Sequence, residues 1–101
     1  MKKPSGPVLN RNKILKTLVA NREKIDSYSV RKIGLFGSYL SGRQKKGSDL
    51  DFLVVFDKPT FRNYMGLKFF LEDLFHRKVD LVIEEDLKPE LKYVREEAVY
   101  V

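Results

Sequence analysis

The sequence predicts a single α/β (α+β) domain, with helices packed against a mixed sheet of three or four strands. The chain has 101 residues, which is enough for one modest hydrophobic core and too few for two. Its apolar fraction of 43% is typical of a globular protein. Segments whose apolar residues recur at helical spacing alternate with short, nearly continuous apolar runs. That alternation favours helices covering a sheet.

The N-terminal part of the chain predicts a tail, a helix and a strand. Residues 1–8 contain two prolines and a glycine, so we expect a flexible N-terminus there and a folded domain over residues 9–101. Between residues 9 and 26, apolar side chains recur at the spacing of one helix face. Residues 30–36 then suit a short strand.

The rest of the chain predicts three further helical segments and three further strands. The apolar run that follows two aspartates is expected to be a strand covered on both faces. In chain order we expect a helical turn at 38–41, a cationic loop at 42–47, a strand at 50–56, a helix ending near 75, a strand at 78–83, a helix at 87–97 and a short edge strand at 99–101.

Two aspartates stand at the start of the second predicted strand. Strand side chains alternate between faces, so Asp49 and Asp51 should project the same way while Leu50 points opposite. Their Cα atoms are expected about 6–7 Å apart, within reach of one shared divalent ion or of a pair of ions. Two adjacent carboxylates repel each other unless a cation or a shared proton compensates. The pair therefore predicts a metal site.

A glycine–serine turn precedes the aspartates by about ten residues. Gly37 lets the backbone turn sharply after a strand and approach a ligand closely. Ser38 would cap the following helical turn, and its hydroxyl could donate to a phosphate oxygen. A helix N-terminus adds unpaired N–H donors and a partial positive charge. Together with the aspartates, this turn predicts a metal-bound nucleoside triphosphate as ligand.

The cationic loop between the turn and the aspartates has two readings. Gly42 and Gly47 bracket Arg43, Lys45 and Lys46, whose charges could screen a triphosphate. A loop of this composition is also common as a simply solvated surface.

Asp80 lies inside the third predicted apolar strand. A carboxylate there is costly unless it is paired or binds a metal, so it is a candidate third ligand beside Asp49 and Asp51. The alternative is an exposed position at a strand end, beside Arg77 and Lys78.

Composition narrows the metal, the compartment and the partner. The chain has no cysteine, which excludes disulfides and thiolate sites and favours Mg²⁺ or Mn²⁺ on oxygen ligands over zinc. The longest apolar run, residues 52–56, is far too short for a membrane span, so we expect a cytoplasmic protein without membrane contact.

The charges are unevenly distributed along the sequence. Residues 1–48 carry 12 Lys and Arg against 2 Asp and Glu, whereas residues 49–101 carry 8 against 12. The basic first part suits a polyanionic ligand, nucleic acid or a merely well-solvated surface.

At this point the residues resemble a known family. The pattern Gly-Ser-x3-Gly-x5-Ser-Asp-x-Asp, from Gly37 to Asp51, with a later strand aspartate at Asp80, resembles the DNA polymerase beta-like nucleotidyltransferase superfamily. The short length resembles its minimal branch, the MNT proteins that act as antitoxins to HEPN-domain toxins. The resemblance covers about residues 14–101 and implies that residues 9–101 form a minimal nucleotidyltransferase domain.

The resemblance implies an enzyme that binds Mg²⁺ and ATP and transfers AMP to a tyrosine of a partner HEPN toxin. Asp49 and Asp51 would hold two Mg²⁺ ions, and Asp80 would complete the catalytic metal site and help deprotonate the acceptor hydroxyl. Gly37 and Ser38 would bind the β- and γ-phosphates.

Two further positions belong to the implied nucleotide site. Many relatives have Ala-Arg before the second glycine, where this chain has Leu40 and Ser41. Arg43 lies near enough in sequence to replace the missing arginine, and Ser48 stands directly before the aspartate pair.

Two other functions stay open. One is a binding-only antitoxin that neutralises its toxin by complex formation without catalysis. The other is a small-molecule or RNA nucleotidyltransferase. Only about 20 residues follow Asp80, so we expect the acceptor to arrive on another molecule. Direct nucleic-acid binding is not expected, because the chain lacks an interleaved aromatic and basic surface.

Overall fold

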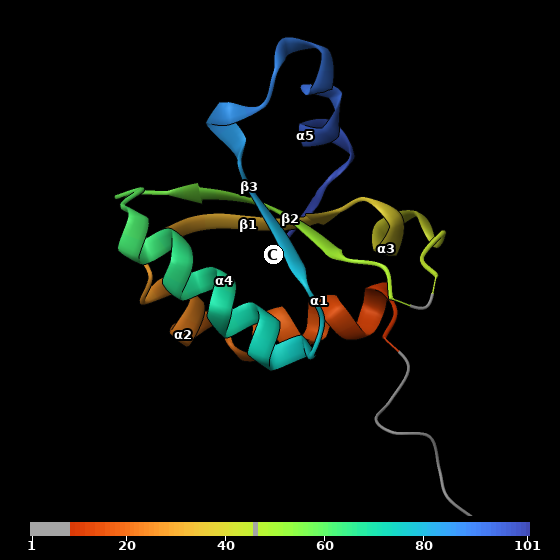
Figure 1. The fold of residues 1–101 in the computed structure, drawn as a ribbon, viewed down its shortest axis with the longest axis horizontal. Coiled ribbons are helices and arrows are strands. Elements are labelled where there is room, and N and C mark those ends of the chain that lie inside the picture. Colours follow the sequence, from red (N-terminus) through yellow and green to blue (C-terminus); the bar gives the residue numbers. More distant parts are fainter. Residues whose placement is uncertain (1–8, 46) are drawn as a thin grey trace, which may run out of the picture.

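A computed structural model describes residues 9–45 and 47–101 (Figure 1). The flexible N-terminus expected at residues 1–8, and Lys46 of the cationic loop, lie outside the described residues. The elements in chain order are α1 (Arg11–Ala20), α2 (Arg22–Asp26), β1 (Val30–Phe36), α3 (Ser38–Ser41), β2 (Leu50–Phe56), α4 (Phe61–Phe75), β3 (Val79–Ile83), the 3-10 turns η1 (Glu84–Asp86) and η2 (Pro89–Leu91), α5 (Tyr93–Glu97) and β4 (Val99–Tyr100).

The four strands form one mixed sheet in the order β3-β2-β1-β4. β1 pairs antiparallel with β2 and with β4, whereas β2 and β3 run parallel. Figure 1 shows α1, α2 and α4 together on one side of the sheet and α5, with the 3-10 turns that lead to it, on the other. The mixed sheet with helices packed against it confirms the predicted fold class.

The core lies between the sheet and the helices α1, α2 and α4. The central strand β2 alternates as predicted: Leu50, Phe52 and Val54 belong to the main core cluster. Leu53 points the other way and is also fully buried. The strand is therefore covered on both faces, as its continuous apolar run predicts.

The predicted first helix is interrupted. α1 ends at Ala20 and α2 begins at Arg22, because Asn21 leaves the helical backbone (φ −111°, ψ 21°). The Asn21 side chain donates to the carbonyl of Thr17 at 2.9 Å, a local bond that competes with helix continuation.

The predicted helix over residues 87–97 is wrong in its length. The segment consists of η1, η2 and the five-residue α5. Lys88 is extended (ψ 153°), as expected of a residue that precedes a proline, and Pro89 itself cannot donate a backbone hydrogen bond. As a result the segment from Glu84 to Ala98 arches over the sheet instead of packing as one helix (Figure 1).

Within residues 9–45 and 47–101, every helix is too short or too polar to cross a bilayer. This agrees with the absence of a long apolar run in the sequence.

Candidate active site

Three strand positions form one row across the sheet. In the β1–β2 register Phe36 is opposite Asp51, and in the β2–β3 register Asp51 is opposite Asp80. Neighbouring strands lie about 4.8 Å apart, and residues directly opposite each other point to the same face. The row therefore brings Asp51 and Asp80 together, although they are 29 positions apart in the sequence.

Gly37 lies directly against the carboxylate of Asp51. The glycine follows β1 with φ +81° and ψ −154°, a backbone conformation that side chains disfavour. A Cβ at this position would be 2.9 Å from Asp51 Cγ and closer still to Oδ2. The turn after β1 thus comes within contact distance of the Asp51 carboxylate only because residue 37 has no side chain.

Asp49 lies just outside the strand, since β2 begins at Leu50. It is exposed, whereas Asp51 is partly buried. Burial, then the charge of Asp80 and then that of Asp49 raise the pKa of Asp51 from 3.8 to about 6. The charges of Asp80 and Asp49 therefore both act on Asp51, as expected of a site that binds positive charge.

The described residues contain no cluster of three acidic or histidine side chains placed close enough to hold a metal ion by themselves. Charge repulsion acts over longer distances than metal coordination, so the pKa of Asp51 and this finding are compatible. Mg²⁺ is usually held by one or two carboxylates together with substrate phosphates and water. The oxygen donors of Asp51 and Asp80 suit such an ion, and the metal role of the three aspartates stays a prediction.

The three other predicted ligand residues lie in the turn and loop between β1 and β2. Ser38 is the first residue of α3 and is partly buried. Arg43 is exposed, and its backbone N–H donates to the backbone carbonyl of Ser38 at 2.9 Å. Ser48 closes the loop: its hydroxyl accepts from Lys45 N at 2.8 Å, and its N–H donates to Lys45 O at 2.9 Å. Ser48 therefore has a structural role in the loop whatever it binds.

We call the row Phe36–Asp51–Asp80 the acidic row. A cleft of about 560 Å³ opens beside it. Its lining combines two residues of the predicted site, Gly37 and Asp80, with the segment that arches over the sheet. The cleft is lined by Phe36, Gly37, Asp80, Val82, Asp86, Leu87, Lys88, Leu91, Tyr93, Val94 and Glu97.

Sequence reasoning missed this cleft. Leu87, Leu91 and Val94 recur at helical spacing, which predicts the buried face of one helix. Because the segment folds as separate short turns, these side chains line a cavity instead. Only the proline at position 89 gave a signal that the helix would not be regular.

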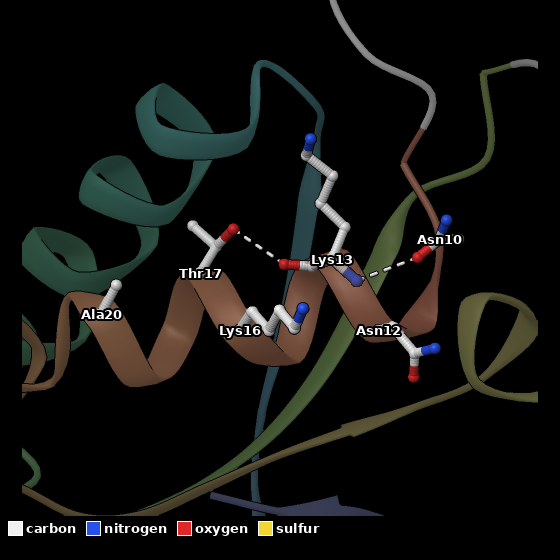
Figure 2. Close-up of a pocket in the computed structure, with 6 residues that line it drawn as sticks. All are labelled: Asn10, Asn12, Lys13, Lys16, Thr17 and Ala20. Carbon is white, nitrogen blue, oxygen red and sulfur yellow. Dashed lines mark hydrogen bonds between the residues drawn. The ribbon is translucent and has the colours of Figure 1, made fainter.

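A second pocket of about 510 Å³ lies along α1 (Figure 2). Two of its polar side chains make hydrogen bonds within the helix and its N-cap. Asn10 Oδ1 accepts from Lys13 N at 2.9 Å, and Thr17 Oγ1 donates to Lys13 O at 2.8 Å. No predicted site residue lines it, so it is separate from the acidic row.

Known proteins match most of the length of the chain. The sequence profile of a family described as a nucleotidyltransferase domain matches residues 12–101. The protein adenylyltransferase MntA of Thermococcus cleftensis is 38% identical over 97 residues, which cover 93% of this chain and 98% of the relative.

Two solved structures have a similar fold. A minimal nucleotidyltransferase is 35% identical, with a TM-score of 0.71, and the match covers 93% of this chain and 98% of the other. A toxin–antitoxin crystal structure with AMP-PNP is 32% identical, with a TM-score of 0.57, and the match covers 82% of this chain and 64% of that one.

Proposed function

The chain belongs to the nucleotidyltransferase domain family, and on this premise we propose that it is a Mg²⁺-dependent protein adenylyltransferase that acts as an antitoxin. It transfers AMP from ATP to a tyrosine hydroxyl of a partner HEPN-domain toxin. The adenylyltransferase relative supports this activity. The similarity to a solved toxin–antitoxin structure supports a toxin as the partner. The solved toxin–antitoxin complex with AMP-PNP supports ATP as the donor.

The observation that carries the proposal is the row Phe36–Asp51–Asp80 with Gly37 against Asp51. Gly37 and Asp80 line the cleft, and Asp51 lies between them as the neighbour of both. This combination suits a triphosphate whose charge is balanced by divalent ions.

Each acidic residue has a role in the proposal. Asp49 and Asp51 would hold two Mg²⁺ ions, and Asp80 would complete the site and accept the proton of the attacking hydroxyl. The chemistry that bound Mg²⁺ supplies is neutralisation of the negative charge on the triphosphate. Asp80 is exposed on the row, so an acceptor brought by another protein could reach it.

The turn and loop residues would bind the donor. Gly37 and Ser38 would bind the β- and γ-phosphates. The lack of a Cβ at residue 37 lets the backbone lie directly against the Asp51 carboxylate, beside the ions that the carboxylate would hold. Arg43 would supply positive charge from the exposed loop, and Ser48 would keep that loop in shape through its bonds to Lys45.

Label transfer from ATP marked in its α-phosphate tests the proposal. The purified chain is mixed with Mg²⁺ and with the toxin encoded beside it, in wild-type and Asp49→Asn/Asp51→Asn forms. We expect label on a tyrosine of the toxin with the wild type only, and none when Mg²⁺ is removed by a chelator. Asp57→Asn/Asp73→Asn is the matched control, because it removes the same charge from two exposed positions outside the row.

The same experiment separates the alternative of binding without catalysis. If the Asp49→Asn/Asp51→Asn variant still neutralises the toxin and no label appears with the wild type, the protein acts by complex formation alone. Label on a small molecule or an RNA, but not on the toxin, would replace the proposed acceptor.

A further inference from the structure

Tyr93 lines the same cleft as two of the predicted site residues, Asp80 and Gly37. Asp80 comes from β3, Gly37 from the turn after β1, and Tyr93 from the first turn of α5. Tyr93 is 55% exposed, so it is open to solvent while it lines the cleft. A nucleophile of the class that the proposed reaction uses therefore lies in the chain's own site.

None of the other tyrosines lines this cleft. All five tyrosines fall within residues 9–45 and 47–101: Tyr28, Tyr39, Tyr64, Tyr93 and Tyr100. Tyr39 is 4% exposed, and the hydroxyls of Tyr64 and Tyr100 donate hydrogen bonds to a backbone carbonyl and to a carboxylate. Tyr28 packs on Phe70 of α4, with ring centroids 6.1 Å apart.

We propose that Tyr93 is a self-modification site, adenylylated by the chain's own active site. The inference rests on the proposed function, because it uses the same donor and the same carboxylates. The Tyr93 oxygen forms a bond to the α-phosphorus of ATP, and the bond from that phosphorus to the bridging oxygen of the β-phosphate breaks. Pyrophosphate leaves, and the hydroxyl proton passes to Asp80 and then to solvent.

The surroundings of Tyr93 suit the product. The adenylylated tyrosine carries one negative phosphodiester charge, and Lys88 in the same cleft supplies a compensating ammonium. Leu91 and Val94 give the cleft apolar walls against which a nucleoside can pack. Since donor site and acceptor share one cleft, the reaction is intramolecular and its effective concentration does not depend on how much protein is present.

The test is incubation of the purified chain, without any toxin, with Mg²⁺ and ATP, followed by intact-mass measurement and peptide mapping. We expect a mass gain of one adenylyl group on Tyr93. Because the step is intramolecular, the fraction of chain modified per unit time should not change across a roughly 10-fold range of protein concentration. Tyr93→Phe removes only the hydroxyl and should abolish the gain, whereas the matched control Tyr28→Phe should leave it unchanged. Asp49→Asn/Asp51→Asn should also abolish it.

A parallel reaction with the toxin keeps this inference separate from the proposed function. Label on the toxin but not on the chain overturns self-modification and leaves the proposed function intact. Label on neither protein contradicts the proposed function itself. Label on the chain that persists in Tyr93→Phe, or that rises with protein concentration, overturns the assignment to Tyr93 in its own site.

Discussion

The backbone of Gly37 lies so close to the carboxylate of Asp51 that a side chain at residue 37 would collide with it. A Cβ on residue 37 would meet Asp51 Cγ at 2.9 Å, and the backbone there has φ +81°. Any side chain at residue 37 would displace the carboxylate from its present place beside Asp80, its neighbour in the row. The position of the Asp51 carboxylate therefore depends on the backbone of the turn at Gly37.

Gly37→Ala should strongly reduce AMP transfer and destabilise the fold. The substitution adds the cost of a positive φ, about 1–2 kcal/mol, to a collision with Asp51. Displacement of the carboxylate by about 1 Å is expected to lower the transfer rate about 100-fold. The measurements are thermal unfolding and label transfer from ATP.

Gly42→Ala is the matched control for that prediction. Gly42 has nearly the same φ, +82°, but no described atom lies within 4 Å of its Cβ position. We expect a similar cost for the backbone and much less loss of transfer. Equal losses of transfer in the two variants would show that strain, and not the contact with Asp51, explains the effect.

Asp51→Asn should stabilise the metal-free protein at neutral pH. The folded pKa of Asp51 is raised to about 6, so the folded state holds this proton more tightly than the unfolded chain. Its favourable contribution is present below the ordinary value of 3.8 and is lost as the pH rises through about 6. The variant should gain about 1 kcal/mol above that pH, after allowance for solvent screening, or about 4–8 °C in Tm.

Thermal unfolding from pH 4 to pH 8 checks this prediction. The difference between wild type and Asp51→Asn should be small at pH 4 and should level off above pH 7. Addition of Mg²⁺ with a nonhydrolysable ATP analogue should raise the Tm of the wild type and not that of the variant. A wild type more stable than the variant at pH 7 without metal would show that the row is not under electrostatic strain.

Local patterns predicted the bounds of two strands and the proximity of Asp51 to Asp80. The bounds of β1 and β2 were predicted as found, since Gly37 directly follows β1 and Asp57 directly follows the apolar run of β2. The meeting of Asp51 with Asp80 also follows from local signals, because both are aspartates near the start of neighbouring strands. The α/β (α+β) class needed no more information than this order of elements.

The cleft could not be predicted in the same way. Its walls come from β1, β3 and the segment after Glu84, and only packing brings them together. The spacing of Leu87, Leu91 and Val94 suits a regular helix equally well, so the pattern alone could not distinguish a core face from a cavity wall. The break at Asn21 is similar, because its cause is a side-chain bond to Thr17 that the sequence only permits.

Glu72→Gln should weaken the attachment of α4 to the start of β3. Glu72 Oε2 accepts from Val79 N at 3.0 Å and lies 3.3 Å from Lys68 Nζ. The hydrogen bond from Val79 N–H and then the contact with Lys68 lower the pKa of Glu72 below its ordinary value of 4.5. Its contribution is therefore present above that value and is lost as the pH falls through the lowered folded pKa.

The expected loss is about 1 kcal/mol at pH 7, since the carboxylate is partly exposed. Chemical unfolding at pH 7 and pH 3 measures it, with Glu96→Gln at an exposed position of α5 as control. The two curves of wild type and Glu72→Gln should converge at the lower pH. An equal difference at both values would mean that the glutamate stabilises by packing and not by its charge.

Tyr100→Phe should loosen the segment that forms the wall of the cleft. Tyr100 of β4 donates to Glu84 Oε2 at 2.8 Å, which ties the two ends of the arching segment together. Burial and then this bond raise the pKa of Tyr100 to about 12, so its contribution is present below pH 10 and is lost as the pH rises toward 12. The ring itself would stay against Gly34, where a Cβ would meet Cδ1 at 2.8 Å.

Removal of the hydroxyl should therefore cost about 1 kcal/mol without displacing β4. Amide hydrogen exchange should speed up in residues 84–98 and stay unchanged in α4, because only the tie at the base of the segment is lost. Faster exchange throughout the sheet would show that the hydroxyl holds the whole fold. Unchanged exchange in residues 84–98 would show that packing of the ring alone fixes the cleft wall.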